Sequence, residues 1–172
     1  MKKFGGPVLF LDRSDINTDE IIPAKYLTEN AKADLKPYVL EDLNLEGCDP
    51  QQEALGPAGV IVTRANFGCG SSREHAVWVL EVNDINVVIA ESFARIFRQN
   101  MFNCGLMAIE LEAADIDALF RLGKGVAIQV DIDKGVITAR NGQEKTLSFT
   151  LNPFDEELVK AGGWLTYANV NY

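Results

Sequence analysis

Short, almost entirely apolar runs recur through the first two thirds of the sequence and constrain the fold more than any other feature. They occupy residues 8–11 (VLFL), 59–62 (GVIV), 86–90 (NVVIA) and 106–111 (LMAIEL). Runs of this length without alternation are typical of strands buried on both faces of a sheet. Segments of helical character, residues 72–82 and 93–102, separate the last three runs, and Ser92 is the expected N-cap of the second helix. This order predicts βαβ units on a largely parallel sheet.

The segment from residue 17 to about residue 57 has a different character. It is weakly periodic and contains four prolines, Pro23, Pro37, Pro50 and Pro57. Because proline interrupts regular helices, we expect short helical turns and loops there.

The last third predicts antiparallel strands followed by a helix. A short helix at residues 116–122 ends at Gly123, and β-rich runs then flank turn sequences at residues 133–135 and 141–142. Asp/Asn-Gly turns between such runs are the strongest local hairpin signal. Asn152-Pro153 starts a further helix that ends at Gly162-Gly163. With no repeat or linker, residues 1–172 are expected to form a single α/β domain with a mixed sheet and a β-hairpin part.

Charge and composition exclude several classes of protein. With 47% hydrophobic and 24% charged residues, the chain is typical of a soluble globular protein. The formal charge of −9 disfavours nucleic acid as a partner, because phosphate backbones are bound by clustered Lys and Arg. No apolar run is long enough for a membrane span or a signal-peptide core, so we expect no membrane association and a cytoplasmic location.

Cysteine usage argues against a metal centre in this chain. Cys48, Cys69 and Cys104 are scattered, and His75 is the single histidine. Zinc and iron–sulfur sites need closely spaced ligands such as Cys-x-x-Cys, and a disulfide framework needs an even count. The sequence predicts no metal bound by this chain.

Residues 66–76 (NFGCGSSREHA) carry the most informative pattern. A strand runs through two glycines into an expected helix start that bears two serines and Arg73. Glycines allow a ligand to approach the backbone closely, and a guanidinium matches a carboxylate or phosphate, so this segment predicts a small anion site. The alternative is that Ser71 and Glu74 form a capping box and have only this structural role. His75 lies four positions after Ser71, but we interpret it as a histidine with a core hydrogen bond.

Residues 15–29 (DINTDEIIPAKYLTE) form a second notable segment. Its polar start suggests that Thr18 or Asp19 caps a turn, and Ile21-Ile22 is expected to enter the core. A calcium loop is improbable, because the central glycine and terminal glutamate of that pattern are missing.

Three segments together resemble a known family. Residues 17–24 (NTDEIIPA), 66–76 (NFGCGSSREHA) and 92–97 (SFARIF) are similar to the signatures of the small subunits of the aconitase superfamily, and most of all to the 3-isopropylmalate dehydratase small subunits. The resemblance runs in order from about residue 12 to residue 163. It implies the swivelling β/β/α domain of the aconitase C-terminal type.

The resemblance also implies a function in a complex. Members are hydro-lyases that isomerise 2- and 3-isopropylmalate by dehydration and rehydration in leucine biosynthesis. A partner large subunit, in a heterodimer or heterotetramer, binds a [4Fe–4S] cluster whose open iron acts as Lewis acid on the hydroxy-dicarboxylate substrate. By match to the family motif, Ser71 would be the base that takes the proton from carbon. Ser72 and Arg73 would bind a substrate carboxylate, with Asp19 and Gly70 in supporting roles.

Substrate choice is implied to depend on the loop that contains Tyr26, Leu27 and Thr28. Homoaconitase-like members place an arginine after the Tyr-Leu pair, where this chain has Thr28, and Glu29 would repel an added carboxylate. A purely apolar pocket would nevertheless prefer less polar residues than Thr28 and Glu29. Hydratases that act on citraconate/methylmalate or on 2,3-dimethylmalate therefore remain alternatives. Homoaconitate is a less favoured substrate.

Hypotheses from other classes also stay open. The chain could be a non-catalytic subunit that binds small anions at residues 70–73, or a scaffold in which the glycine loop is only a tight turn. A large-subunit gene beside this one, encoding three cluster cysteines, would favour the enzyme.

Overall fold

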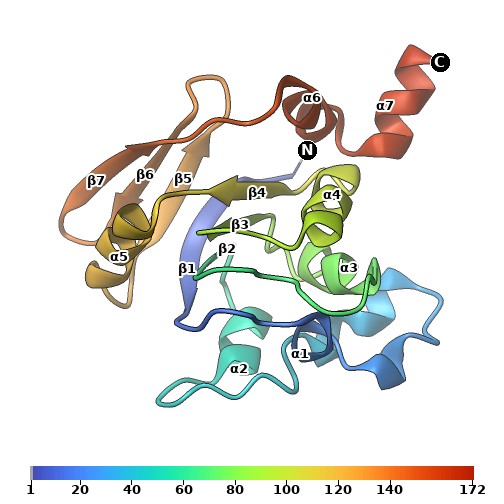
Figure 1. The fold of residues 1–172 in the computed structure, drawn as a ribbon, viewed down its shortest axis with the longest axis horizontal. Helices are drawn as coiled ribbons and strands as arrows, with labels where there is room; N and C mark the ends of the chain where they lie inside the picture. Colours follow the sequence, from blue (N-terminus) through green and yellow to red (C-terminus); the bar gives the residue numbers. More distant parts are fainter. Residues whose placement is uncertain (1) are drawn as a thin grey trace.

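The computed structural model describes residues 2–172, which contain one seven-stranded mixed sheet (Figure 1). The strand order is β4-β3-β2-β1-β5-β6-β7. The strands are β1 (Gly5–Leu11), β2 (Val60–Thr63), β3 (Val87–Ala90), β4 (Met107–Glu110), β5 (Ala127–Asp131), β6 (Val136–Arg140) and β7 (Glu144–Ser148). The first four are parallel, and β5–β7 are antiparallel to their neighbours. The fold is therefore α/β, with the parallel core and the hairpin part that the sequence predicts.

The two central parallel strands, β2 and β3, are fully buried, which explains their unbroken apolar runs. Every residue of β2 and β3 is buried, and Val60 pairs with Val8 on one side and with Val87 on the other. Since both faces are covered, alternation of polar and apolar residues is neither needed nor present. In β6, by contrast, buried residues such as Ile137 and Ala139 alternate with more exposed ones.

Helices and 3₁₀ turns connect these strands. The α-helices are α1 (Thr18–Ile21), α2 (Pro50–Leu55), α3 (His75–Glu81), α4 (Arg95–Asn103), α5 (Ala113–Arg121), α6 (Pro153–Ala161) and α7 (Trp164–Asn171), and the 3₁₀ helices are Ala24–Tyr26 and Lys32–Tyr38. The short elements between residues 17 and 57 confirm the expectation for that segment. Among residues 2–172, no helix combines the length and apolarity that a membrane span requires.

The local end signals of α6 were predicted correctly. The Asn152 side chain accepts a hydrogen bond from the Phe154 amide at 2.9 Å, Pro153 begins the helix, and Gly162 ends it with φ +89°. The helix α7 that follows was not anticipated. Gly163 precedes it directly, and its apolar residues do not gather on one face, so no periodic pattern indicated a helix there. Figure 1 shows α7 at the edge of the molecule, beside α6.

Two predicted helix starts are wrong. Helix α3 begins at His75 rather than residue 72, so Ser72 and Arg73 lie in a loop. Helix α4 begins at Arg95 with Ala94 as its N-cap, and the Ser92 hydroxyl instead accepts a hydrogen bond from the Asn66 amide at 2.8 Å. At α4 the cause is a tertiary contact, because the hydroxyl that local pattern assigns to the helix cap is used by the neighbouring loop.

Candidate functional site

The loops that follow β1, β2 and β3 meet at one edge of the sheet, as the carboxyl ends of adjacent parallel strands must. The loop after β2 lies between the other two. Gly68 donates its amide to the Ile16 carbonyl at 2.8 Å, and Phe67 exchanges hydrogen bonds with the loop after β3, donating to Ser92 at 3.1 Å and accepting from Ala94 at 3.0 Å. These three loops carry the three signature segments, which the fold therefore brings together.

Glycine is required at two positions of the central loop. Gly68 has φ +83°, and a Cβ there would lie 2.6 Å from Cδ1 of Phe97. Gly70 has φ +91° with no close neighbour, so it is needed for its backbone conformation alone. Asn66, at φ +58°, tolerates the left-handed region, and its amide nitrogen donates to the Asp15 carboxylate at 2.9 Å.

Ser71, Ser72 and Arg73 follow this loop and precede α3. Both serines are exposed, and Arg73 is half-buried. The predicted alternative of a capping box is wrong, because the N-cap of α3 is Glu74 and no side chain caps this helix. Instead, the Thr18 hydroxyl donates to the Ser71 carbonyl at 2.8 Å, which fixes the chain at this serine.

The segment before α1 supports the same edge of the sheet. Asn17 caps α1, rather than Thr18 or Asp19 as predicted, and forms a capping box with Glu20. Desolvation opposes ionisation of Glu20, but hydrogen bonds from Arg13 and the Asn17 amide outweigh it and lower the pKa of Glu20. Ile21 and Ile22 are fully buried, as predicted. The Asp19 carboxylate is left to pair with the guanidinium of Arg73.

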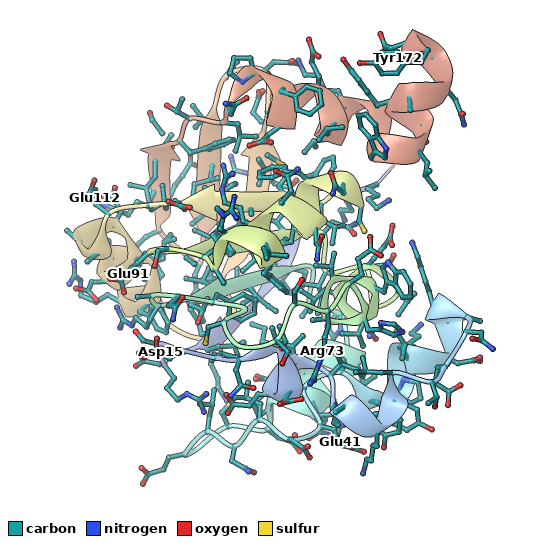
Figure 2. All side chains as sticks on the ribbon, turned by 45° about the vertical axis from the view of Figure 1, so that its right-hand side comes forward. Asp15, Glu41, Arg73, Glu91, Glu112 and Tyr172 are labelled. Atoms are coloured by element: carbon teal, nitrogen blue, oxygen red, sulfur yellow. The ribbon has the colours of Figure 1, made fainter. Side chains whose placement is uncertain are left out.

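A cavity of about 240 Å³ opens between these elements. It is lined by Thr18, Gly68, Gly70, Ser71, Ser72, Arg73, Ala94, Arg95, Ile96 and Phe97. Two arginines and two serines thus border one small space. Such a set of donors suits the carboxylates of a small organic acid. In Figure 2, Arg73 lies in the lower half of the molecule, far from Tyr172 at the upper end.

Of the predicted site residues, Gly70, Ser71, Ser72 and Arg73 line this cavity, and Asp19 contacts it through Arg73. Tyr26, Leu27 and Thr28 do not line it. The Tyr26 ring stacks on Tyr38 with centroids 3.7 Å apart, and its hydroxyl donates to Glu41 at 2.9 Å. Thr28 is exposed.

Sequence reasoning missed six of the lining residues, and two of these, Thr18 and Arg95, have polar or charged side chains. Both lie inside the signature segments, but Thr18 was expected only as a cap of a turn, and no role was assigned to Arg95. The signal available was topological: a residue at the start of the helix after β3 must lie beside the loop after β2, because β2 and β3 are adjacent and parallel.

His75 does not act on Ser71 in this structure. Its ring packs against Trp78, with centroids 4.6 Å apart. The expected core hydrogen bond of its side chain is not formed within residues 2–172, so this interpretation was wrong. The packing against Trp78 follows from the helical spacing of the two residues on α3.

The cysteines do not fit an iron–sulfur cluster. Within the described chain, no three side chains of His, Cys, Asp or Glu are grouped to hold a metal ion. Burial raises the pKa of the Cys48 and Cys104 thiols to about 11, and it also raises that of Cys69. Because thiolates rather than thiols bind metals, these raised pKa values oppose ligation.

Comparisons with known proteins agree with this architecture. The family model of the aconitase C-terminal domain matches residues 25–114. A 3-isopropylmalate dehydratase small subunit from Deinococcus deserti is 45% identical, over 90% of this chain and 81% of that protein, and one from Aliarcobacter butzleri is 41% identical, over 90% and 88%.

A solved structure is also similar. The crystal structure of 3-isopropylmalate dehydratase from Methanocaldococcus jannaschii has a TM-score of 0.81 at 31% identity, covering 98% of this chain and 94% of that one. The resemblance inferred from the three signature segments is thereby confirmed, as is the aconitase C-terminal type of fold. The chain belongs to the 3-isopropylmalate dehydratase small-subunit family, a group of hydro-lyase subunits with the aconitase C-terminal fold.

Proposed function

We propose that this chain is the small subunit of a hydro-lyase that interconverts 2- and 3-isopropylmalate, the isomerisation step of leucine biosynthesis. The observation that carries the proposal is the placement of Ser71. Its exposed side chain lies on a loop held by Thr18, at a cavity that it shares with Arg73 and Arg95. The family membership of the chain supports the same activity.

Ser71 is proposed as the base. In the dehydration of 2-isopropylmalate it takes the proton from the carbon next to the one that bears the hydroxyl group, and it returns a proton to carbon in the reverse direction. A serine needs stabilisation of its oxyanion to do this. Arg73, two positions along the same loop, lines the cavity beside Ser71, and its guanidinium supplies positive charge.

Ser72 and Arg73 are proposed to bind one substrate carboxylate. The Asp19 carboxylate already holds the Arg73 guanidinium, which reduces the freedom that the side chain must lose when substrate binds. Arg95 borders the same cavity, and within residues 2–172 no carboxylate lies within ion-pair distance of it, so it is available for the second carboxylate of a diacid. A dicarboxylate would thus meet one cation from the loop after β2 and one from the start of α4.

Tyr26, Leu27 and Thr28 are proposed to select the alkyl end of the substrate from outside the cavity. The nearby cation Lys25 is paired with Glu41 at 3.6 Å, which leaves it poorly suited to bind a third carboxylate. This arrangement favours alkylmalates over homoaconitate. Methylmalate and 2,3-dimethylmalate remain in the panel of substrates to be compared.

A partner large subunit is proposed to complete the site and to carry the [4Fe–4S] cluster, in a heterodimer or heterotetramer. The cysteines of this chain do not fit the cluster. The cavity of about 240 Å³ is also smaller than the ~300–1,000 Å³ usual for complete ligand sites. The continuous sheet supports treating residues 1–172 as one swivelling domain.

The test is reconstitution with the large subunit. The two subunits are co-expressed, the cluster is assembled anaerobically, and turnover is measured on C4–C7 hydroxy-diacids for wild type, Ser71→Ala and Ser148→Ala. Ser148 is an exposed serine at the end of β7, outside the cavity, and serves as the matched control. The pair should isomerise isopropylmalate or a shorter alkylmalate, while the isolated chain should be colourless and inactive.

Loss of the base should lower kcat by about 10³-fold or more in Ser71→Ala, since essential catalytic groups contribute on this scale. The Ser148→Ala variant should behave as wild type. If Ser71→Ala retains more than a tenth of kcat, Ser71 is not the base. If the wild-type pair binds alkylmalates without turnover, a non-catalytic anion-binding subunit is the better description.

A further inference from the structure

Thr18 is a buried polar residue with an unusual partner. Its residue surface is 2% exposed, and its hydroxyl donates to the Ser71 carbonyl at 2.8 Å, across 53 positions of sequence. We propose that Thr18 is the positioning residue of Ser71, which rests on the proposed role of Ser71 as the base. In this role Thr18 acts through the Ser71 carbonyl.

Two hydrogen bonds from Thr18 bracket Gly70. The Thr18 amide donates to the Cys69 carbonyl at 2.9 Å, and the Thr18 hydroxyl holds the carbonyl two residues later. Between these points Gly70 has φ +91°, and a Cβ there would find its nearest neighbour, Cβ of Asn17, at 3.5 Å. The loop is therefore not fixed by packing at this glycine, and the two hydrogen bonds from Thr18 restrain it instead.

Few other contacts hold this part of the chain. Ser71 and Ser72 are exposed, and within residues 2–172 no other hydrogen bond to residues 70–72 is formed. At the next residue along the chain, the Arg73 guanidinium pairs with Asp19, and the Arg73 carbonyl accepts a hydrogen bond from the Ala76 amide at 3.2 Å. If the Thr18 bond is lost, rotation about Ser71 and its neighbours moves the serine hydroxyl. Displacement of a catalytic group by about 1 Å can cost ~100-fold in rate.

Thr63 provides a matched control for the structural part of this role. It is 1% exposed, and its hydroxyl donates to the Leu11 carbonyl at 2.8 Å across 52 positions, with a longer contact of 3.3 Å to Arg13. Burial, donor and distance thus match those of Thr18. The difference is that Thr63 does not line the cavity and holds no residue that does.

The experiment compares Thr18→Val, Thr18→Ser and Thr63→Val in the reconstituted complex. Valine keeps the shape and removes the hydroxyl, so both valine variants should lose similar thermal stability. Thr18→Val should lower kcat by about 30- to 100-fold with KM within about threefold of wild type. Thr18→Ser should restore kcat to within about threefold, because it restores the donor, and Thr63→Val should leave kcat nearly unchanged.

A second measurement uses the full chain without its partner. Backbone ¹⁵N order parameters of residues 70–73 should fall in Thr18→Val and stay at wild-type values in Thr63→Val, since they report fast local motion. Unchanged order parameters in Thr18→Val would overturn the positioning role whatever the kinetics show.

The outcomes separate the two proposals. If Ser71→Ala is inactive but Thr18→Val matches Thr63→Val in kcat, the positioning role is wrong and the base assignment stands. If Ser71→Ala remains active, the base assignment is wrong and the inference about Thr18 is wrong with it.

Discussion

Arg73 and Asp19 form an ion pair although they are 54 positions apart in the sequence. The pair joins the loop after β2 to α1, and the Arg73 side chain is 16% exposed while that of Asp19 is 59% exposed. The arginine is thus largely enclosed at the cavity, and its partner faces solvent. A side chain that is already oriented loses less entropy when it binds a carboxylate.

Replacement of Arg73 by lysine should reduce kcat/KM by ~30- to 1,000-fold, which corresponds to ~2–4 kcal/mol. A lysine is a point charge and cannot form two parallel bonds to a carboxylate while keeping Asp19. Steady-state kinetics of the reconstituted complex measure the loss. Arg140→Lys, in an exposed pair with Glu144 on β6 and β7, is the control and should leave kcat/KM unchanged. Near-normal kinetics of Arg73→Lys would assign the arginine a purely structural pairing with Asp19.

Thr28→Arg should shift substrate preference toward tricarboxylates such as homoaconitate. Thr28 is exposed, so the longer side chain is accommodated without loss of stability, and its charge offsets the repulsion from Glu29. The wild-type complex should reject such substrates and discriminate alkylmalates that differ by one methylene by only ~1–3 kcal/mol. The measurement is the ratio of kcat/KM values for homoaconitate and isopropylmalate in both complexes. A wild-type preference for homoaconitate over every alkylmalate would refute this role of the loop.

Gly68→Ala should be strongly destabilising, whereas Gly142→Ala should not. Both glycines have positive φ, +83° and +71°, but a Cβ at Gly68 overlaps the Phe97 ring and a Cβ at Gly142 meets nothing within 4 Å. Gly142→Ala therefore reports backbone strain alone, ~1–2 kcal/mol, while Gly68→Ala adds ~1–3 kcal/mol of overpacking. Urea unfolding of the two variants measures the difference. An equal loss of unfolding free energy in the two variants would mean that the Phe97 ring moves away from the added Cβ without destabilising the fold.

Glu20 should make the stability of the chain depend on acid pH. Its pKa in the folded chain is lowered from the usual 4.5, so the stabilisation is complete above pH 4.5 and is lost as the pH falls through the lower folded value. Glu20→Gln should therefore be less stable than wild type at pH 7. The difference in stability between the two proteins should become smaller below pH 4.5. Thermal unfolding between pH 7 and pH 3 measures this.

The control for this pH experiment is Glu144→Gln, which removes an exposed ion pair with Arg140. Exposed pairs contribute little, so this variant should follow the wild-type curve. A constant gap between wild type and Glu20→Gln across the whole range would show that the hydrogen-bonding shape of the side chain matters and its charge does not.

The sequence by itself determined the elements whose signals are local. The unbroken apolar runs predicted the buried parallel strands, because burial on both faces removes any need for alternation. Turn residues predicted the β5–β7 hairpins, and Asn152-Pro153 predicted the start of α6, since these residues act through their own backbone geometry. The three signature segments likewise sufficed to indicate the family.

Only the tertiary structure decided how the site is assembled. Local pattern assigned Ser71 to a capping box and Ser92 to an N-cap, yet both residues contact other elements, Ser71 through its carbonyl with Thr18 of α1 and Ser92 through its hydroxyl with Asn66. The sequence also did not predict that Thr18 and Arg95 line the cavity, because the position of each depends on a neighbour that is distant in the sequence. The physical reason is that the parallel sheet places the ends of β1, β2 and β3 side by side, and hydrogen bonds between their loops replace the local caps that each segment would form alone.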